Sequence, residues 1–292
     1  MIEWSREEWK SRQAEHLERV QALADRFAQR RSHGTKHPVE DFLFTYYNLS
    51  PAKLKEWVPP LGTAIEVTAD DLLECPWLAS ERFIRSNGLI GLDTGRLADS
   101  TKQLANWIRE LCERVLDRSA RFRCFGLHEW AMVYQQPAEQ IRHQGYELRL
   151  PPDDVARFVD SQAVCCTHYD AFRFFTPAAE PLNAFQPTLE TRLEMEQGGC
   201  LHTNMDLYKW SAKLLPWCGS DLVGECFANA WAARQLDMRA SPYELRSLGY
   251  EPVFIETAEG RAEYETHQKA IATAAEPLRR QLHALATAVT QA

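Results

Sequence analysis

Residues 261–290, RAEYETHQKAIATAAEPLRRQLHALATAVT, repeat apolar side chains at intervals of three and four residues. The stripe consists of Ile271, Ala274, Leu278, Leu282, Leu285 and Val289. Apolar residues with this period lie on one face of an α-helix, which turns that face towards a core. The stretch therefore predicts a long amphipathic helix and a fold in which helices dominate.

The first thirty residues predict a second long helix. Ser5 followed by Glu8 matches a capping box, in which two side chains bond the first backbone amides of a helix. An apolar stripe then follows at helical spacing through Leu17, Val20, Ala24 and Phe27. We expect the first and last helices to pack through their stripes. Further helices are predicted to begin at Ser50–Pro51, Thr188 and Ser241, and to run over 220–236.

Only a few short segments have the composition and alternation of β-strands. They lie at 64–67, 146–150 and 163–166. The sequence contains no internal repeat and no Gly/Ser-rich linker, so nothing marks a domain boundary. We predict one mainly α-helical domain over residues 1–292 with at most a few short strands, the alternative being an α+β fold.

Composition limits the classes of partner. The 292 residues carry a formal net charge of −8, which disfavours extended binding to DNA because Lys and Arg must neutralise phosphates. No apolar run approaches the roughly 20 residues that a membrane-spanning helix needs, and the charged first residues do not resemble a signal peptide. The eight cysteines include no CxxC pair, so we expect reduced, mostly buried thiols. We expect a cytoplasmic protein with no membrane partner.

Four segments place histidines and carboxylates among aromatic and aliphatic residues, where an unpaired polar group is costly. In KHPVEDFLFTYY, either Asp41 stabilises a helix start and His37 lies on the surface, or both enter a site. In FGLHEWAMVY, either structural hydrogen bonds satisfy His128 and Glu129, or the two perform acid–base chemistry in a cavity.

The third and fourth segments leave similar alternatives. In CCTHYDAFRFFT, an extended chain would point His168 and Asp170 to one face, whereas a helix would pair Asp170 with Arg173. In GGCLHTNMDLYKW, a helix would place His202 and Asp206 on one stripe, either facing solvent beside a lysine or presented to a metal or substrate.

Together the four segments favour one shared cavity. Grouping these residues is the simplest way to partner so many ionisable side chains among aromatics. Mixed histidine and carboxylate sets bind Zn, Mn or nonheme Fe, although no established metal signature occurs. The candidate metal ligands are His37, His168, His202 and Asp206.

Long motifs carry a family resemblance. They are KHPVEDFLFTYY (36–47), FGLHEWAMVY (125–134), THYDAFRFFTPAAEPLN (167–183), GCLHTNMDLYKW (199–210), QLDMRASPYELRSLGYEP (235–252) and IETAEGRAEY (255–264). With these motifs the chain resembles, over roughly residues 16–285, a bacterial family whose members are labelled 3-methyladenine DNA glycosylase. The resemblance implies excision of an alkylated purine base from DNA or from a nucleoside.

That activity would need a carboxylate to stabilise an oxocarbenium-like state, and a pocket that stacks on the base. The catalytic candidates are Glu129, Asp170, Asp41, Asp206 and His128. The candidates for substrate binding are Tyr46, Tyr47, Trp130, Arg173, Phe174, Asn204 and Lys209. Phosphate contacts would fall to Arg26, Arg30, Arg31 and Lys36, or to Arg114, Arg118, Arg121 and Arg123.

Two other classes of function fit the same residues. One is a metal-dependent enzyme that acts on a small molecule through a histidine and carboxylate cluster. The other is a noncatalytic protein that binds a nucleobase or another planar ligand in an aromatic cavity. Metal content and base release from alkylated substrates separate the three hypotheses.

Overall fold

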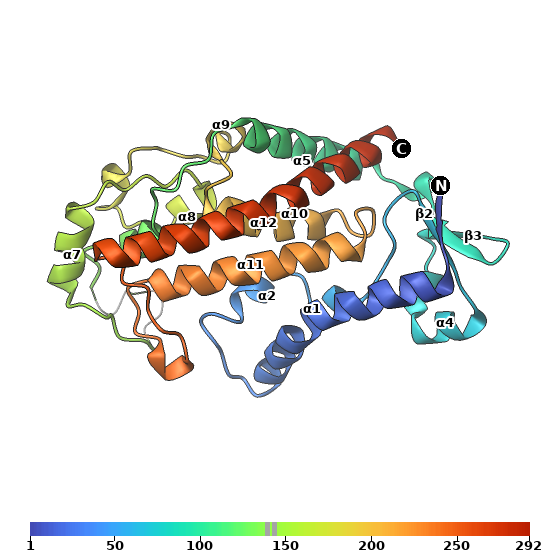
Figure 1. Cartoon of the computed structure of the whole chain (residues 1–292), viewed down its shortest axis with the longest axis horizontal. Helices are drawn as coiled ribbons and strands as arrows, with labels where there is room; N and C mark the ends of the chain where they lie inside the picture. Colours follow the sequence, from blue (N-terminus) through green and yellow to red (C-terminus); the bar gives the residue numbers. More distant parts are fainter. Residues whose placement is uncertain (138–140, 142–144) are drawn as a thin grey trace. The chain divides into compact units, whose positions relative to one another are not determined.

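A computed structural model describes residues 1–137, 141 and 145–292 (Figure 1). The chain forms two compact units, each assembled from separate stretches of sequence. The first comprises Met1–Glu113, Asp206–Ala230 and Pro277–Ala292. The second comprises Arg114–Met205 and Trp231–Glu276. Helices dominate, so the mainly α-helical fold class is confirmed.

The elements divide between the units as follows. The first unit contains β1 (Ile2–Trp4), α1 (Arg6–Ser32), α2 (Phe42–Tyr46), α3 (Pro51–Lys55), β2 (Thr63–Glu66), α4 (Ala69–Glu74), β3 (Phe83–Ser86) and β4 (Leu89–Leu92). The second contains α6 (Leu127–Ala131), α7 (Pro152–Asp160), α8 (Tyr169–Phe172) and α9 (Arg192–Met195). Residues of both units occur in α5 (Asp99–Asp117), α10 (Leu201–Lys213), α11 (Ser220–Ala240) and α12 (Ala258–Gln291).

A small sheet belongs to the first unit, and Figure 1 labels two of its strands, β2 and β3. The strand order is β1-β2-β4-β3. β1 pairs with β2 in parallel, and the other pairs are antiparallel. Asn87 and Gly88 join β3 to β4, with φ angles of 51° and 81°. Positive φ at both positions is typical of a two-residue hairpin turn that matches the twist of the strands.

Tryptophans form the core beside this sheet. The rings of Trp9 on α1 and Trp57 stack with centroids 5.7 Å apart, and both residues are fully buried. Each indole N–H finds an acceptor, since Trp9 donates to the Glu66 carbonyl and Trp57 to the Asp221 carboxylate. A buried indole needs such a partner. The Trp9 bond therefore joins α1 to β2, and the Trp57 bond joins the chain before β2 to the start of α11.

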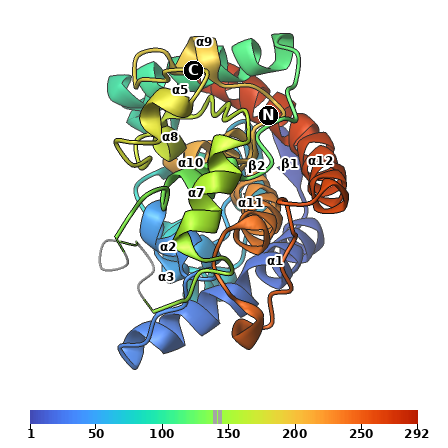
Figure 2. The same cartoon turned by 90° about the vertical axis from the view of Figure 1, so that its left-hand side faces the viewer.

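Short helices and connecting segments build much of the second unit, as the turned view shows (Figure 2). Asn183 joins two of these segments. Its Oδ1 accepts from the Cys166 backbone N–H at 2.7 Å, and its Nδ2 donates to the Cys166 carbonyl at 2.9 Å. A side-chain amide thus satisfies backbone groups that a strand partner would otherwise satisfy.

Most of the predicted long elements are confirmed. Ser5 caps α1 by accepting from the Glu8 N–H, the predicted helix over 220–236 is α11, and the strand at 64–67 is β2. In α12, Ile271, Leu282 and Val289 are buried, Leu278 and Leu285 half-buried, and Ala274 exposed. No helix in the described part of the chain is long and apolar enough to cross a membrane.

Four local predictions are wrong. No helix begins at Ser241, because Tyr243 forms an isolated bridge with Leu148 instead. Where a strand was predicted at 146–150, the structure has only this isolated bridge at Leu148. The strand predicted at 163–166 is a loop held by Asn183. The helix predicted from Thr188 is only the single turn α9, which begins at Arg192.

One ion-paired carboxylate gives a testable contribution to stability. Asp71 is fully buried and accepts two hydrogen bonds from Arg6, at 2.8 Å each. It also completes the capping box of α4 with Thr68. Hydrogen bonds from Arg6 and Thr68 outweigh burial and hold the pKa of Asp71 well below its usual range.

We therefore expect Asp71→Ala to destabilise the fold by about 1–2 kcal/mol at neutral pH. Because the pKa of Asp71 is depressed, this contribution is present above its unfolded pKa of about 3.9 and disappears as the pH falls further. Thermal unfolding from pH 7 to pH 2 checks the effect, with the exposed neighbour Asp70→Ala as control. A deficit that persists undiminished at pH 2 would contradict the assignment.

Candidate functional site

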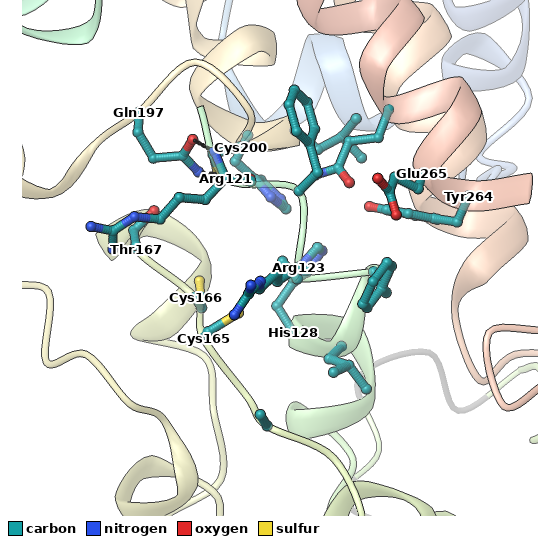
Figure 3. A pocket seen from close by; sticks show the side chains of 18 of the residues that line it. Arg121, Arg123, His128, Cys165, Cys166, Thr167, Gln197, Cys200, Tyr264 and Glu265 are labelled. Atoms are coloured by element: carbon teal, nitrogen blue, oxygen red, sulfur yellow. Dashed lines mark hydrogen bonds between the residues drawn. The ribbon is translucent and has the colours of Figure 1, made fainter. Parts of the chain in front are cut away.

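A large cavity lies within the second unit (Figure 3). Its volume is about 1030 Å³. Most of its wall comes from residues 120–128, residues 162–167, the start of α10 and the first turns of α12, and Ala184, Phe185 and Gln197 complete it. Cavities of this size accommodate drug-sized or cofactor-sized molecules. His128 and His202 both line it.

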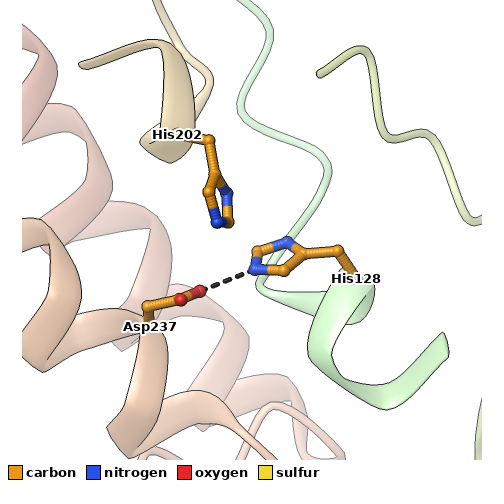
Figure 4. Close-up of side chains that lie close together, drawn as sticks. All are labelled: His128, His202 and Asp237. Atoms are coloured by element: carbon orange, nitrogen blue, oxygen red, sulfur yellow. Dashed lines mark hydrogen bonds and ion pairs between the residues drawn. The ribbon is translucent and has the colours of Figure 1, made fainter. Parts of the chain in front are cut away.

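Three side chains converge beside this cavity (Figure 4). They are His128 on α6, His202 on α10 and Asp237 on α11. Nε2 of His128 lies 2.6 Å from Oδ1 of Asp237, and the two imidazole centroids are 4.5 Å apart. One ligand atom from each residue lies within 4.8 Å of the other two. The cluster is buried, with exposed fractions of 2%, 8% and 0%.

A turn with positive φ angles precedes α6 and places His128 in the cluster. Phe125 and Gly126, which precede α6, have φ angles of 47° and 75°. A Cβ at Gly126 would lie 3.3 Å from both Ala240 and Tyr264, so only glycine suits both the backbone and the space. A left-handed conformation at Phe125 is costly, and such strain is often retained where it positions a functional side chain.

The guanidinium of Arg234 balances the negative charge of Asp237 in the three-residue cluster. Nη1 of the buried Arg234 donates to Oδ2 of Asp237 at 3.0 Å and to Oε1 of Glu129 at 3.4 Å. Burial favours the neutral form of Asp237, but the positive charges and hydrogen bond of its neighbours outweigh it and hold the pKa below the usual range. Asp237 is therefore a carboxylate at neutral pH.

The pKa values of His128 and His202 are shifted in opposite directions. Burial lowers the pKa of His128, but the charge of Asp237 and its hydrogen bond outweigh burial, so the pKa is raised. Burial and the nearby His128 lower the pKa of His202 well below its ordinary value. His202 is therefore a neutral imidazole with a free electron pair, which is the form that binds a metal.

Four cysteine thiols line the same cavity: Cys124, Cys165, Cys166 and Cys200. The Cys124 Sγ lies 3.6 Å from Nδ1 of His128, so Cys124, His128 and Asp237 form a chain that resembles a catalytic triad. Burial, however, raises the pKa of Cys124 well above its ordinary value and that of Cys200 to about 11. Reactive cysteines have lowered pKa values, and this arrangement therefore does not favour a thiolate nucleophile.

The third predicted segment forms α8, so the helical alternative with an Asp170–Arg173 pair is realised, at 3.5 Å. Asp170 also accepts from Arg192 at 2.8 Å. His168 packs against His202 with centroids 5.5 Å apart, and its Nδ1 lies 3.3 Å from a Glu196 carboxylate oxygen. Asp170 does not line the cavity, so its visible role is in ion pairs.

The other predicted residues of the second unit are held by structural contacts. Trp130 donates to the Ala240 carbonyl at 2.8 Å, and Asn204 donates to the Gly198 carbonyl at 2.9 Å. The Arg173 guanidinium lies 4.6 Å from the centroid of the Phe174 ring. Glu129, Trp130, Arg173, Phe174 and Asn204 do not line the cavity.

The remaining candidates belong to the first unit. Asp41 is the N-cap residue of α2 but makes no side-chain cap bond to that helix. Its carboxylate accepts from Arg30 and from the His37 backbone N–H, so structural contacts hold it in place of the predicted helix cap. Asp206 pairs with Lys209 at 3.2 Å. Two tyrosines complete this set: Tyr46 stacks on Phe42, and Tyr47 packs edge-on against Tyr208.

Asp237 is the site residue that the sequence analysis missed. A signal for it was present, because Arg234 falls in the apolar register of the helix predicted over 220–236. A buried arginine requires an acidic partner, and Asp237 lies three residues later on the same helical face. Asp237 also lies within the motif QLDMRASPY, which carries part of the family resemblance.

The chain was compared with protein-family models, with curated proteins and with solved structures, and none of the three comparisons gives a match. A function for this chain is therefore argued from the chemistry of its own site.

Proposed function

We propose that the protein is a metal-dependent enzyme that acts on a small molecule bound in the cavity of the second unit. His128, His202 and Asp237 would be the protein ligands of the ion. The observation that carries the proposal is the convergence of these three buried side chains, whose ligand atoms lie within 4.8 Å of one another.

The donor set indicates which ions to expect. Two imidazoles and one carboxylate are the ligands of nonheme Fe(II) centres, and similar sets bind Mn and Zn. His202 is neutral and Asp237 is ionised, so both are in the state that binds metal. The binding of an ion would release the proton that His128 shares with Asp237.

Neighbouring residues would orient the ligands. Arg234 fixes the second oxygen of Asp237, and Cys124 lies against the Nδ1 side of His128. Such outer contacts set the position of a ligand and are nearly as important as the ligand itself. His128 and His202 face the cavity, where a bound ion could polarise a substrate oxygen or activate water.

Metal analysis tests the proposal. We expect purified protein, prepared without a metal-affinity column, to contain one transition-metal ion per chain. After removal by chelator, calorimetric titration with Fe(II), Mn(II) or Zn(II) should restore one ion, with Kd below about 10 µM.

The matched control compares His202→Gln with His267→Gln, since His267 is half exposed on α12 in the same unit. The first variant should lose the ion and the second should retain it. Equal metal content in both variants, or no ion in the wild-type protein at about 100 µM metal, would overturn the proposal.

A second candidate is the N-glycosylase activity implied by the family resemblance. Four aromatic residues in the cavity wall support it, because an excised base would stack between such rings: Phe122, Phe125, Phe185 and Tyr264. Within this cavity His128, held by Asp237, is the group that could orient water. Glu129 is instead paired with Arg234 outside the lining.

Base release distinguishes the two candidates. Alkylated DNA and alkylated nucleosides are assayed separately, each with and without chelator. Release that survives the chelator and fails in His128→Gln would favour the glycosylase. Release abolished by the chelator would favour the metal enzyme, and binding of a planar ligand without any turnover would favour the noncatalytic alternative.

A further inference from the structure

The cavity of the second unit is electropositive although the chain is acidic. Four cations line it, Arg121, Arg123, Arg261 and Lys269, against the single carboxylate of Glu265. The whole chain has a net charge of −8. A local positive excess inside a concave wall attracts anions and focuses their approach.

Two of the four cations are already engaged. Lys269 lies 2.6 Å from the Glu265 carboxylate, and Arg261 donates to the Ile255 carbonyl at 2.9 Å. Among the described residues, no carboxylate lies within ion-pair distance of Arg121 or Arg123. Both side chains are exposed at the cavity (Figure 3). These two guanidinium groups are therefore the ones available to an anionic ligand.

The segment that carries Arg121 is held firmly. Its backbone N–H donates to Oε1 of Gln197 at 2.8 Å, and Nε2 of Gln197 donates back to the Arg121 carbonyl at 3.4 Å. A Cβ at Gly199 would lie 2.4 Å from that carbonyl, so glycine permits the close approach. The Arg121 guanidinium lies over the Phe185 ring, 5.2 Å from its centroid. A preorganised cation loses little entropy when it binds an anion.

A buried acceptor indicates a second feature of the ligand. Gln268 is 1% exposed and lines the cavity. Its Nε2 donates to the Gly199 carbonyl at 2.7 Å, which fixes the orientation of the amide. In the described structure Oε1 of Gln268 has no hydrogen-bond partner. A buried acceptor without a donor is costly, so a ligand with an N–H or O–H group at this point would be stabilised.

We infer that the ligand of this cavity is a small aromatic molecule that carries an oxyanion and a hydrogen-bond donor. Arg121 and Arg123 bind its phosphate or carboxylate, the aromatic wall stacks on its ring, and Gln268 accepts from its donor. The inference rests on the proposed function in one respect: it takes this cavity as the substrate site.

Matched pairs of probes test the inference by calorimetry on chelator-treated protein. Adenosine 5′-monophosphate is compared with adenosine, and 4-hydroxybenzoate with phenol, so that each pair differs by one oxyanion. We expect at least one anionic probe to bind about tenfold or more tightly than its neutral partner. A preference for the anion in the adenosine pair alone would identify a phosphate ligand. A preference in the phenol pair alone would identify a carboxylate ligand.

Charge-removing variants then locate the contact. The double variant Arg121→Gln, Arg123→Gln should abolish the anion preference: it should weaken the preferred anion about tenfold, to the affinity of its neutral partner, and change that neutral partner less than about threefold. The control is Arg157→Gln on α7, an exposed arginine of the same unit outside the cavity, which should bind like the wild type. Equal binding within both pairs, or a double variant that equals the wild type, would overturn the inference.

A metal titration on the same preparations separates this inference from the proposed function. Metal binding without any anion preference would leave the metal enzyme standing and reject the inferred ligand. Anion binding that depends on Arg121 and Arg123, without metal binding, would retain the ligand class and reject the metal enzyme.

Discussion

Replacement of Asp237 by asparagine is expected to lower metal affinity by more than about 100-fold and turnover by about 10²–10⁴-fold. Asparagine keeps the shape of the side chain but removes the charge with which Asp237 would bind the proposed metal ion. It also removes the anion that holds His128 in place at 2.6 Å. Calorimetric metal titration and elemental analysis of the purified variant measure the effect.

Glu129→Gln provides the matched control for this variant. Glu129 and Asp237 are both buried and both accept from Nη1 of Arg234, so either change takes one carboxylate from the same arginine. Only Asp237 belongs to the three-residue cluster. We expect Glu129→Gln to keep metal affinity within about threefold of the wild type. An equal loss in both variants would mean that the Arg234 network supports the fold and that Asp237 has no separate role in binding metal.

The long helices were predictable because each carries its own signal. The N-cap at Ser5, whose side chain accepts from the Glu8 N–H, and the apolar period of α11 require no knowledge of the rest of the chain. The β3–β4 hairpin carries a local signal too, since Asn87–Gly88 is a strong turn pair, although the strands were not predicted. A turn of this kind is read from two residues and needs no long apolar run.

The errors in the fold come from contacts distant in sequence. Ser241 and Pro242 form a good helix start by local rules, yet Tyr243 pairs with Leu148 nearly a hundred residues away. Residues 163–166 are apolar enough for a strand, but Asn183 supplies the hydrogen bonds to Cys166. Tertiary partners decide between such alternatives, and a local pattern contains no information about them.

The candidate site was predicted in part for the same reason. His128 and His202 stood out because each interrupts an apolar segment, and the structure brings them together. Glu129 and Asp170 stood out equally, but Arg234 and Arg192 satisfy them from other helices. The cost of a buried charge identifies the groups that need partners. It does not tell whether the partner is an arginine or a bound ion.

Leu282 gives the largest effect that we expect on folding. It is fully buried on α12, in the part of that helix that belongs to the first unit. Nearby, Leu285 of α12 and Arg12 of α1 line one small cavity of the first unit. An aspartate at this depth would lose the apolar contacts of leucine and place a charge out of reach of water.

Leu282→Asp should therefore destabilise the first unit by about 4–5 kcal/mol, and Leu282→Ala by about 2–4 kcal/mol through the cavity alone. Thermal unfolding followed by circular dichroism measures both variants. The alanine variant keeps the test readable if the aspartate variant does not fold. Ala288→Asp is the control, since Ala288 is exposed on the same helix and should cost less than about 1 kcal/mol. A similar loss in the Ala288 and Leu282 variants would show that helix propensity, and not burial of the stripe, sets the stability of α12.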